Sequence, residues 1–171
     1  MKENKVYKLV LSAVFCALVF TMTWVAIPAP SVGNINLGDC MVILCATLIG
    51  GWHGVFSAAL GASLCDIASG YTIYAPGTFF IKALMVVVIL IFRKFAFKNN
   101  RTLSIVVSGL CAEVVMILGY FVYEATVLGY GMGAIMNIPF NAIQGVLNLV
   151  AASLLFATLK KAGITKLFSD N

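Results

Sequence analysis

The sequence predicts an all-α integral membrane protein with six transmembrane helices and both termini in the cytoplasm. Of its 171 residues, 62% are hydrophobic and 10% are charged, whereas soluble domains carry about 25% charged residues. A soluble fold of this size has too little interior to bury so much apolar surface. Lysine and arginine residues, moreover, gather at only three places along the chain. We therefore expect residues 1–171 to form one membrane domain.

Apolar runs predict the first three helices at residues 8–27, 37–49 and 52–69. Pro28 and Pro30 end the first helix, because proline lacks the backbone N–H that a helix interior needs. This first run spans about 20 residues, longer than the roughly 7–15 of a secretory signal core, so we expect it to be retained. The glycine-rich segment GGWHG predicts a tight turn between the second and third helices.

The last three helices are predicted at residues 78–92, 103–128 and 134–159. Thr78 is the expected N-cap of the fourth helix, since Pro76 and Gly77 form a turn signal before it. A polar linker, RKFAFKNNR, and a glycine-rich loop, GYGMG, separate the last three helices. The second and fourth helices are shorter than the ~20 residues of a straight span, which leaves open whether their loops extend them.

The distribution of positive charge predicts the orientation in the membrane. Basic residues lie before the first helix, between the fourth and fifth helices and after the sixth. With six spans these three places lie on one side, which the positive-inside rule assigns to the cytoplasm. The residues are Lys2, Lys5 and Lys8; Arg93, Lys94, Lys98 and Arg101; and Lys160, Lys161 and Lys166.

Five ionisable residues lie in or beside the predicted helices: Asp39, Asp66, Lys82, Glu113 and Glu124. Each costs about 2.5–3.5 kcal/mol in a bilayer, so such groups usually face a partner or a water-filled cavity. One base cannot form ion pairs with all four acids. Their depths along the helices place most of them towards the extracellular half, where we expect a polar cavity.

Asn137, Asn141, Gln144 and Asn148 on the sixth helix are spaced i, i+4, i+7 and i+11. This spacing forms one narrow stripe. Four amides facing lipid would be expensive, so the stripe is expected to face protein or a cavity. Hydrogen bonds between helices are the alternative explanation for each single amide. The whole set favours the cavity.

A second stripe on the fifth helix consists of Glu113, Tyr120 and Glu124, and Tyr71 and Tyr74 lie in an adjacent outer loop. Aromatic walls with a few convergent polar groups are typical of small-molecule pockets. Tyrosines also gather at membrane interfaces without binding a ligand.

The sequence contains no GxxxxGK[ST], HExxH or GxSxG motif. The five cysteines lie in apolar stretches without a metal-ligand spacing, and His53 is placed in a cytoplasmic turn. We expect no catalytic residues, no metal, no cofactor and no nucleic-acid partner. Asp39 has a structural explanation of its own, because residues 36–39 fit a helix N-cap followed by an acid in the first turn.

The segments NLGD (36–39), GASLCDIASGY (61–71) and YAPGTFFIKALM (74–85) make the chain similar to the substrate-binding S components of energy-coupling factor (ECF) transporters. These are six-helix membrane proteins of prokaryotes that capture vitamins. Ala13 and Ala17 match the family's AxxxA pattern in the first helix. The resemblance extends from Lys8 to Lys161.

This resemblance implies a partner set and a mechanism. The S component would bind a vitamin from outside, dock on a transmembrane scaffold protein through Ala13 and Ala17, and topple in the membrane. Two cytoplasmic ATPases would use the ATP. Residues 28–36 and 70–77, including Pro76, would act as lids, and Asp39 would pin a loop.

For Asp66, a ligand contact and loop pinning both stay open. The residues expected to bind the substrate are Asn36, Asp66, Tyr71, Tyr74, Lys82, Glu113, Tyr120, Glu124, Asn137, Asn141 and Gln144.

Fold alone does not identify the ligand. A vitamin B6 form, hydroxymethylpyrimidine and riboflavin all suit aromatic, amide and carboxylate side chains. The alternative functions are a self-sufficient secondary transporter or channel and, third, a membrane-embedded enzyme. The absence of a visible inverted repeat disfavours the transporter, and no complete set of catalytic groups supports the enzyme.

Overall fold

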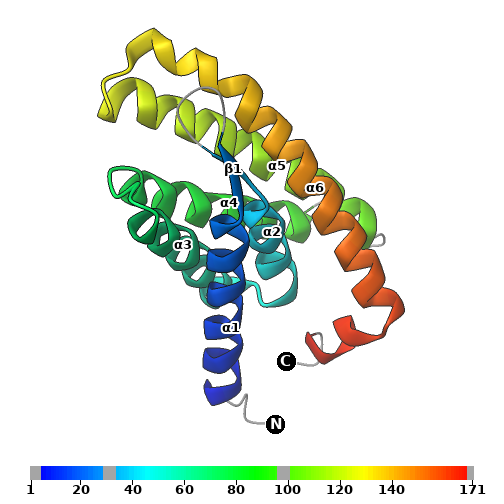
Figure 1. Ribbon diagram of the computed structural model, residues 1–171. Coiled ribbons are helices and arrows are strands. Elements are labelled where there is room, and N and C mark those ends of the chain that lie inside the picture. Colours follow the sequence, from blue (N-terminus) through cyan, green and yellow to red (C-terminus); the bar gives the residue numbers. More distant parts are fainter. Residues whose placement is uncertain (1–4, 29–33, 96–100, 169–171) are drawn as a thin grey trace.

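The computed structural model describes residues 5–28, 34–95 and 101–168. Within these ranges the chain forms six α-helices and one short hairpin (Figure 1). The helices are α1 (Lys5–Trp24), α2 (Gly38–Leu48), α3 (Gly51–Ala68), α4 (Ala75–Phe95), α5 (Arg101–Val122) and α6 (Ile138–Lys161). The remaining elements are strands β1 (Ala26–Pro28) and β2 (Asn34–Asn36), a π-helix η1 (Tyr123–Val127), and 3-10 helices η2 (Gly131–Asn137) and η3 (Ile164–Phe168).

Helix α2 lies at the centre of the bundle, while the other helices pack in the order α1, α3, α4, α5 and α6 around it. It contacts α1, α3, α4 and α6. Val42, Ile43, Cys45 and Ala46 are all fully buried. A helix of 11 residues is about 16 Å long, too short to cross a bilayer. Neighbouring helices, and not lipid, cover the apolar side chains of α2.

Small residues bring α3 close to its neighbours. A Cβ at Gly61 would lie 2.5 Å from the Cys16 carbonyl oxygen of α1. At Gly54 it would lie 3.3 Å from the Cys45 carbonyl oxygen of α2. Ala58 is fully buried. The absence of larger side chains therefore permits close helix packing.

The start of α4 differs from the prediction. The helix begins at Ala75, so Pro76 lies in its first turn, where a missing N–H costs nothing. The Thr78 amide already donates to the Tyr74 carbonyl at 2.9 Å. Thr78 is therefore not the N-cap, and Pro76 and Gly77 do not form a turn. The α4 helix also continues to Phe95, which makes it 21 residues long and no longer short for a span.

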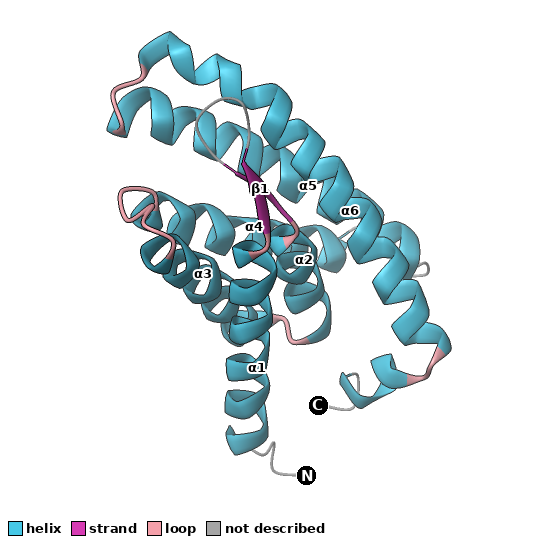
Figure 2. Cartoon of the chain, viewed as in Figure 1, coloured by secondary structure: helices cyan, strands magenta, loops and turns pink. Residues whose placement is uncertain are grey.

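The connection between α1 and α2 is a hairpin, which the sequence did not predict (Figure 2). Ala26 pairs with Asn36 in an antiparallel register. The first helix therefore ends at Trp24 instead of residue 27. The N-cap of α2 is Leu37, and the Asn36 side chain accepts a hydrogen bond from the Gly38 amide at 2.9 Å. Residues 29–33 of the predicted lid lie outside the described residues.

The predicted fifth and sixth helices are each divided. Residues 103–128 form α5 followed by the π-helix η1, and residues 134–159 form part of η2 followed by α6, which ends at Lys161.

Four stretches of the described residues are long and apolar enough to cross a membrane: Lys5–Trp24, Ala75–Phe95, Leu103–Val127 and Gly131–Lys161. The beginning of α1 and the end of α6 lie at the same end of the molecule (Figure 1). Phe15 of α1 and Phe168 of η3 make an edge-to-face contact at 6.5 Å, so the C-terminal segment folds back onto α1.

Candidate ligand-binding cavity

A cavity of about 110 Å³ lies between the hairpin, the loop before α4 and the helices α1, α3, α4, α5 and α6. Aromatic, amide and ionisable side chains line it together. Nine of the residues that the sequence singled out for substrate binding lie on its walls. They are Asn36, Asp66, Tyr71, Tyr74, Lys82, Tyr120, Glu124, Asn141 and Gln144.

Glu113 and Asn137, the other two expected binding residues, do not line the cavity. The Asn137 side-chain amide donates to Glu124 Oε2 at 2.8 Å, so it orients a carboxylate that does line the wall. Glu113 is buried against Gly145, where a Cβ would lie 3.1 Å from Glu113 Oε2. Neither Glu113 oxygen has a hydrogen-bond partner among the described residues.

An ion pair joins α4 to α2 beside the cavity. Lys82 Nζ lies 2.5 Å from Asp39 Oδ1, and both side chains are almost fully buried. The ammonium group also lies 5.2 Å from the centre of the Tyr120 ring. Gln144 Nε2 donates to Asp39 Oδ2 at 3.0 Å. Lys82 thus has an acidic partner, and Asp39 connects α2 to both α4 and α6.

Asn148 and Gln144 attach the hairpin to α6. Asn148 Nδ2 donates to the Asn36 carbonyl at 2.8 Å, and its Oδ1 accepts from the Cys40 amide at 2.7 Å. The Asn36 amide donates to Gln144 Oε1 at 3.1 Å. The polar stripe of α6 therefore faces protein and cavity, as its spacing predicts. Asn137 and Asn148 form hydrogen bonds within the protein and do not line the cavity, whereas Asn141 lines it. Gln144 lines the cavity and also forms hydrogen bonds within the protein.

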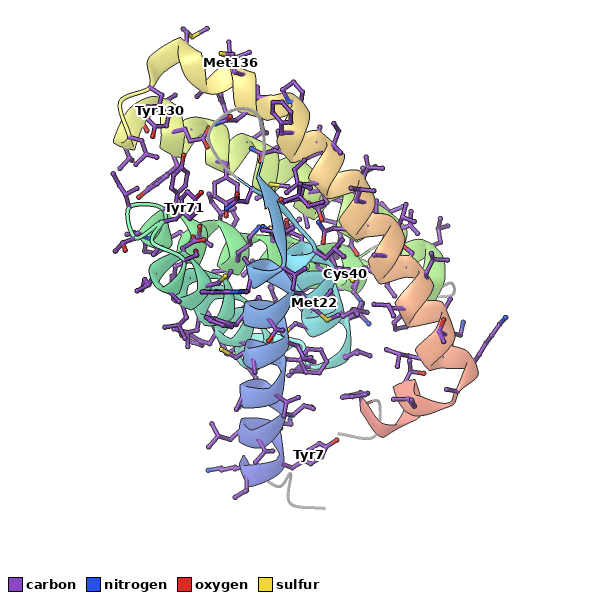
Figure 3. The ribbon with its side chains drawn as sticks, viewed as in Figure 1. Tyr7, Met22, Cys40, Tyr71, Tyr130 and Met136 are labelled. Carbon is purple, nitrogen blue, oxygen red and sulfur yellow. The ribbon has the colours of Figure 1, made fainter. Side chains whose placement is uncertain are left out.

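Tyrosines connect the loop before α4 to the end of α5. The Tyr74 hydroxyl donates to Glu124 Oε1 at 3.4 Å, and the Tyr123 hydroxyl donates to the Ile73 carbonyl at 2.7 Å. Burial, with a smaller contribution from the Glu124 carboxylate, raises the pKa of the Tyr74 hydroxyl above its usual range. Tyr71 and Tyr130 lie on facing loops at this end of the molecule (Figure 3). The Tyr74 and Tyr123 hydrogen bonds hold the loop before α4 against η1.

Sequence reasoning did not assign the remaining lining residues to the cavity, because they lie at helix ends, on the hairpin or among small residues. They are Thr23, Trp24, Ala26, Asn34, Ala62, Cys65, Ser69 and Thr78. Trp24 and Ser69 could have been recognised from the sequence, because each is an amphipathic or polar residue near the C-terminal end of an apolar run. Ala26 and Asn34 reach the cavity only because the chain forms a hairpin.

Ala13 and Ala17, the expected docking residues, are both exposed on α1. Ala13 lines an apolar groove of about 380 Å³ between α1 and α3, together with Trp52 and Phe56. His53 lies on the rim of this groove in the first turn of α3. Among the described residues, no group of three or more His, Cys, Asp or Glu side chains is arranged to hold a metal ion.

A family model described as the S component of ECF-type riboflavin transporters matches residues 3–161. A protein of Pyrococcus woesei, described as an uncharacterized protein in a gap 3′ region, is 34% identical over 146 residues, which cover 85% of this chain and 95% of that protein.

One solved structure, described as the structure and mechanism of the S component of a bacterial ECF transporter, is similar with a TM-score of 0.74. Its sequence is 20% identical, and the match covers 92% of this chain and 98% of that one, so the two proteins share a fold. The family match and the fold agree with the membrane-protein architecture. The chain belongs to the family of S components of ECF-type riboflavin transporters, which are substrate-binding transporter subunits and not enzymes.

Proposed function

We propose that this chain captures a vitamin or related small molecule from outside the cell in the 110 Å³ cavity. It then delivers the molecule through a scaffold protein, driven by two partner ATPases. The observation that carries the proposal is the cavity itself, where aromatic rings, amides and ionisable groups from distant parts of the chain converge. Such a combination is typical of small-molecule sites.

The proposal includes six passages of the chain through the membrane, with both termini in the cytoplasm and with the hairpin before α2 completing the passage that α2 is too short to make by itself. The beginning of α1 and the end of α6 lie at the same end of the molecule, as an even number of crossings requires. Lys94 at the end of α4 and Lys160 at the end of α6 are exposed and follow the positive-inside rule. The cavity, beside Trp24 at the other end of α1, then faces outwards.

We propose a flat heteroaromatic vitamin as the ligand, with riboflavin as the first candidate because the matching family model is described by that substrate. Trp24 and Tyr71 offer faces on which a ring can stack. Asn34 and Asn141 offer paired donors and acceptors for ring carbonyl and N–H groups. A vitamin B6 form and hydroxymethylpyrimidine are the alternatives to test beside it.

Docking on the scaffold through Ala13 and Ala17 completes the proposal. Both residues are small and exposed, so a partner helix can approach α1 closely at this face. The sequence carries no phosphate-binding loop motif, and the ATP is assigned to the partner subunits.

The test uses the purified chain in mild detergent. Native mass spectrometry of protein from rich medium is expected to show a bound molecule of vitamin size. Titration with riboflavin, pyridoxine or hydroxymethylpyrimidine is then followed by tryptophan fluorescence. Trp24 lines the cavity, whereas Trp52, the other tryptophan, lines the groove.

Quenching by the ligand should therefore disappear in Trp24→Phe and persist in Trp52→Phe. Binding of none of the three vitamins, with no co-purified molecule, would contradict the proposal. Uptake by cells that lack the scaffold and ATPases would instead support a self-sufficient transporter.

A further inference from the structure

Asp66 lines the cavity with a carboxyl group whose hydrogen-bonding capacity is only partly used. Its Oδ2 is buried and has no hydrogen-bond partner among the described residues. The other acid on the wall, Glu124, accepts from Asn137 at 2.8 Å and from Tyr74 at 3.4 Å. A buried polar atom without a partner is costly, so its retention requires an explanation.

The position of Asp66 in its helix adds a second cost. Asp66 lies in the last turn of α3, which ends at Ala68. Unpaired carbonyl groups give a helix C-terminus a partial negative charge, so an acid there is unfavourable. Asp66 is not needed to cap the C-terminus of α3 either, because the Ser69 hydroxyl already donates to the Cys65 carbonyl there at 2.7 Å. Residues that break local rules in this way are typical of functional sites.

Charge in the cavity is unbalanced. Lys82 is the only Lys or Arg among the described lining residues, and Asp39 already neutralises it at 2.5 Å. The amides at the start of α2 are also occupied, because Gly38 N donates to the Asn36 side chain and Cys40 N donates to the Asn148 side chain.

An anionic ligand group would therefore meet the carboxylates of Asp66 and Glu124, with no unpaired Lys or Arg among the described lining residues and with the amides of Gly38 and Cys40 at the start of α2 already occupied. A neutral ligand with an N–H or O–H group would meet a free acceptor.

We infer that Asp66 is a specificity-determining residue, which accepts a hydrogen bond from an N–H or O–H of the ligand and disfavours phosphorylated ligands. The inference rests on the proposed function, because it assumes that the cavity binds the vitamin. A phosphate monoester of the vitamin is then captured more weakly than the free vitamin.

The experiment compares riboflavin with riboflavin 5′-phosphate on the purified chain by fluorescence titration. The natural protein should prefer riboflavin by about tenfold or more, as expected when an anion enters a site without a free cation. Asp66→Asn should weaken riboflavin binding by about tenfold, because the acceptor loses its charge. The same change should bring the affinities of the two ligands closer together.

The ligand-free Asp66→Asn variant should also melt at a higher temperature than the natural protein, since a negative charge leaves the C-terminal turn of α3. Ser63→Ala is the matched control. Ser63 is a buried residue of the same helix whose hydroxyl donates to the Ala59 carbonyl, and it does not line the cavity. The preference for riboflavin should be unchanged in this control.

Two results would overturn the inference alone. One is equal affinity of the natural protein for riboflavin and its phosphate. The other is an Asp66→Asn variant that melts at a lower temperature and loses both ligands in parallel, which indicates a structural role. Failure of the natural protein to bind riboflavin, pyridoxine or hydroxymethylpyrimidine would remove the proposed function, and the inference with it.

Discussion

The ammonium nitrogen of Lys82 lies 2.5 Å from Asp39 Oδ1, which places a buried ion pair between α4 and α2 beside the cavity. Gln144 of α6 donates to the second oxygen of the same carboxylate at 3.0 Å. Three helices thus meet at one acidic side chain. Because Gln144 also accepts from the Asn36 amide, the pair is connected to the hairpin over the cavity.

Removal of one partner of this pair should destabilise the protein strongly. Lys82→Met or Asp39→Asn alone is expected to cost about 3–5 kcal/mol, because each leaves a buried group uncompensated. The double variant should cost less than the sum of the two single variants. Thermal melting in detergent measures the effect, and Lys160→Met, at an exposed position on α6, is the control. Additive losses in the double variant would show that the pair is not energetically coupled.

Asn148→Leu should loosen the hairpin and the start of α2 together. It leaves the Cys40 amide and the Asn36 carbonyl without partners, at about 1–3 kcal/mol for each group. Ser153→Ala is the contrasting change on the same helix, since its buried hydroxyl has no partner among the described residues. That variant should melt at or above the temperature of the natural protein. Equal melting temperatures for Asn148→Leu and the natural protein would contradict the assigned role.

Substitutions at Asn141 and Asn137 should have different effects, the first on ligand affinity and the second on thermal stability. Asn141 lines the cavity, so Asn141→Ala is expected to weaken vitamin binding by about tenfold and leave the ligand-free melting temperature unchanged. Asn137→Ala removes the donor to Glu124 and should lower that temperature. Fluorescence titration and thermal melting distinguish the two results. Unchanged affinity in Asn141→Ala would move the ligand away from this wall.

Substitutions on the exposed face at Ala13 and Ala17 should impair transport without weakening vitamin binding. Replacement of both residues by leucine is expected to abolish uptake in cells that contain the complete transporter, because the scaffold helix can no longer approach closely. Purified protein should bind the vitamin as before. Leu154→Trp, an exposed position on α6, is the control for bulk at a lipid-facing site. Normal uptake by the double variant would place the docking surface elsewhere.

Much of the fold was predictable because hydropathy and helical spacing are local properties. Apolar runs predicted the six helices in their correct order, and the spacing of Asn137, Asn141, Gln144 and Asn148 predicted that they share a protein-facing stripe. Segments near Asp39, Asp66 and Lys82 carried the resemblance that the family match confirms. Composition alone indicated a membrane protein.

The partners of these residues depended on the tertiary structure. Lys82 and Asp39 are 43 residues apart, and Gln144 and Asp39 are 105 residues apart. Helical spacing shows which side chains share a face, but not how far each helix is rotated or shifted against its neighbours. That rotation and shift bring Asn141 to the cavity and leave Glu113 buried against Gly145.

The hairpin and the short helix α2 depended on the same long-range contacts. The Asn36 amide and carbonyl are satisfied by Gln144 and Asn148, more than 100 residues away in the chain. The sequence thus determined the protein class, the helix order and the polar faces, which follow from local hydropathy and spacing. Packing alone decided which charges pair, which amides line the cavity and where the cavity lies, because these depend on contacts between helices distant in sequence.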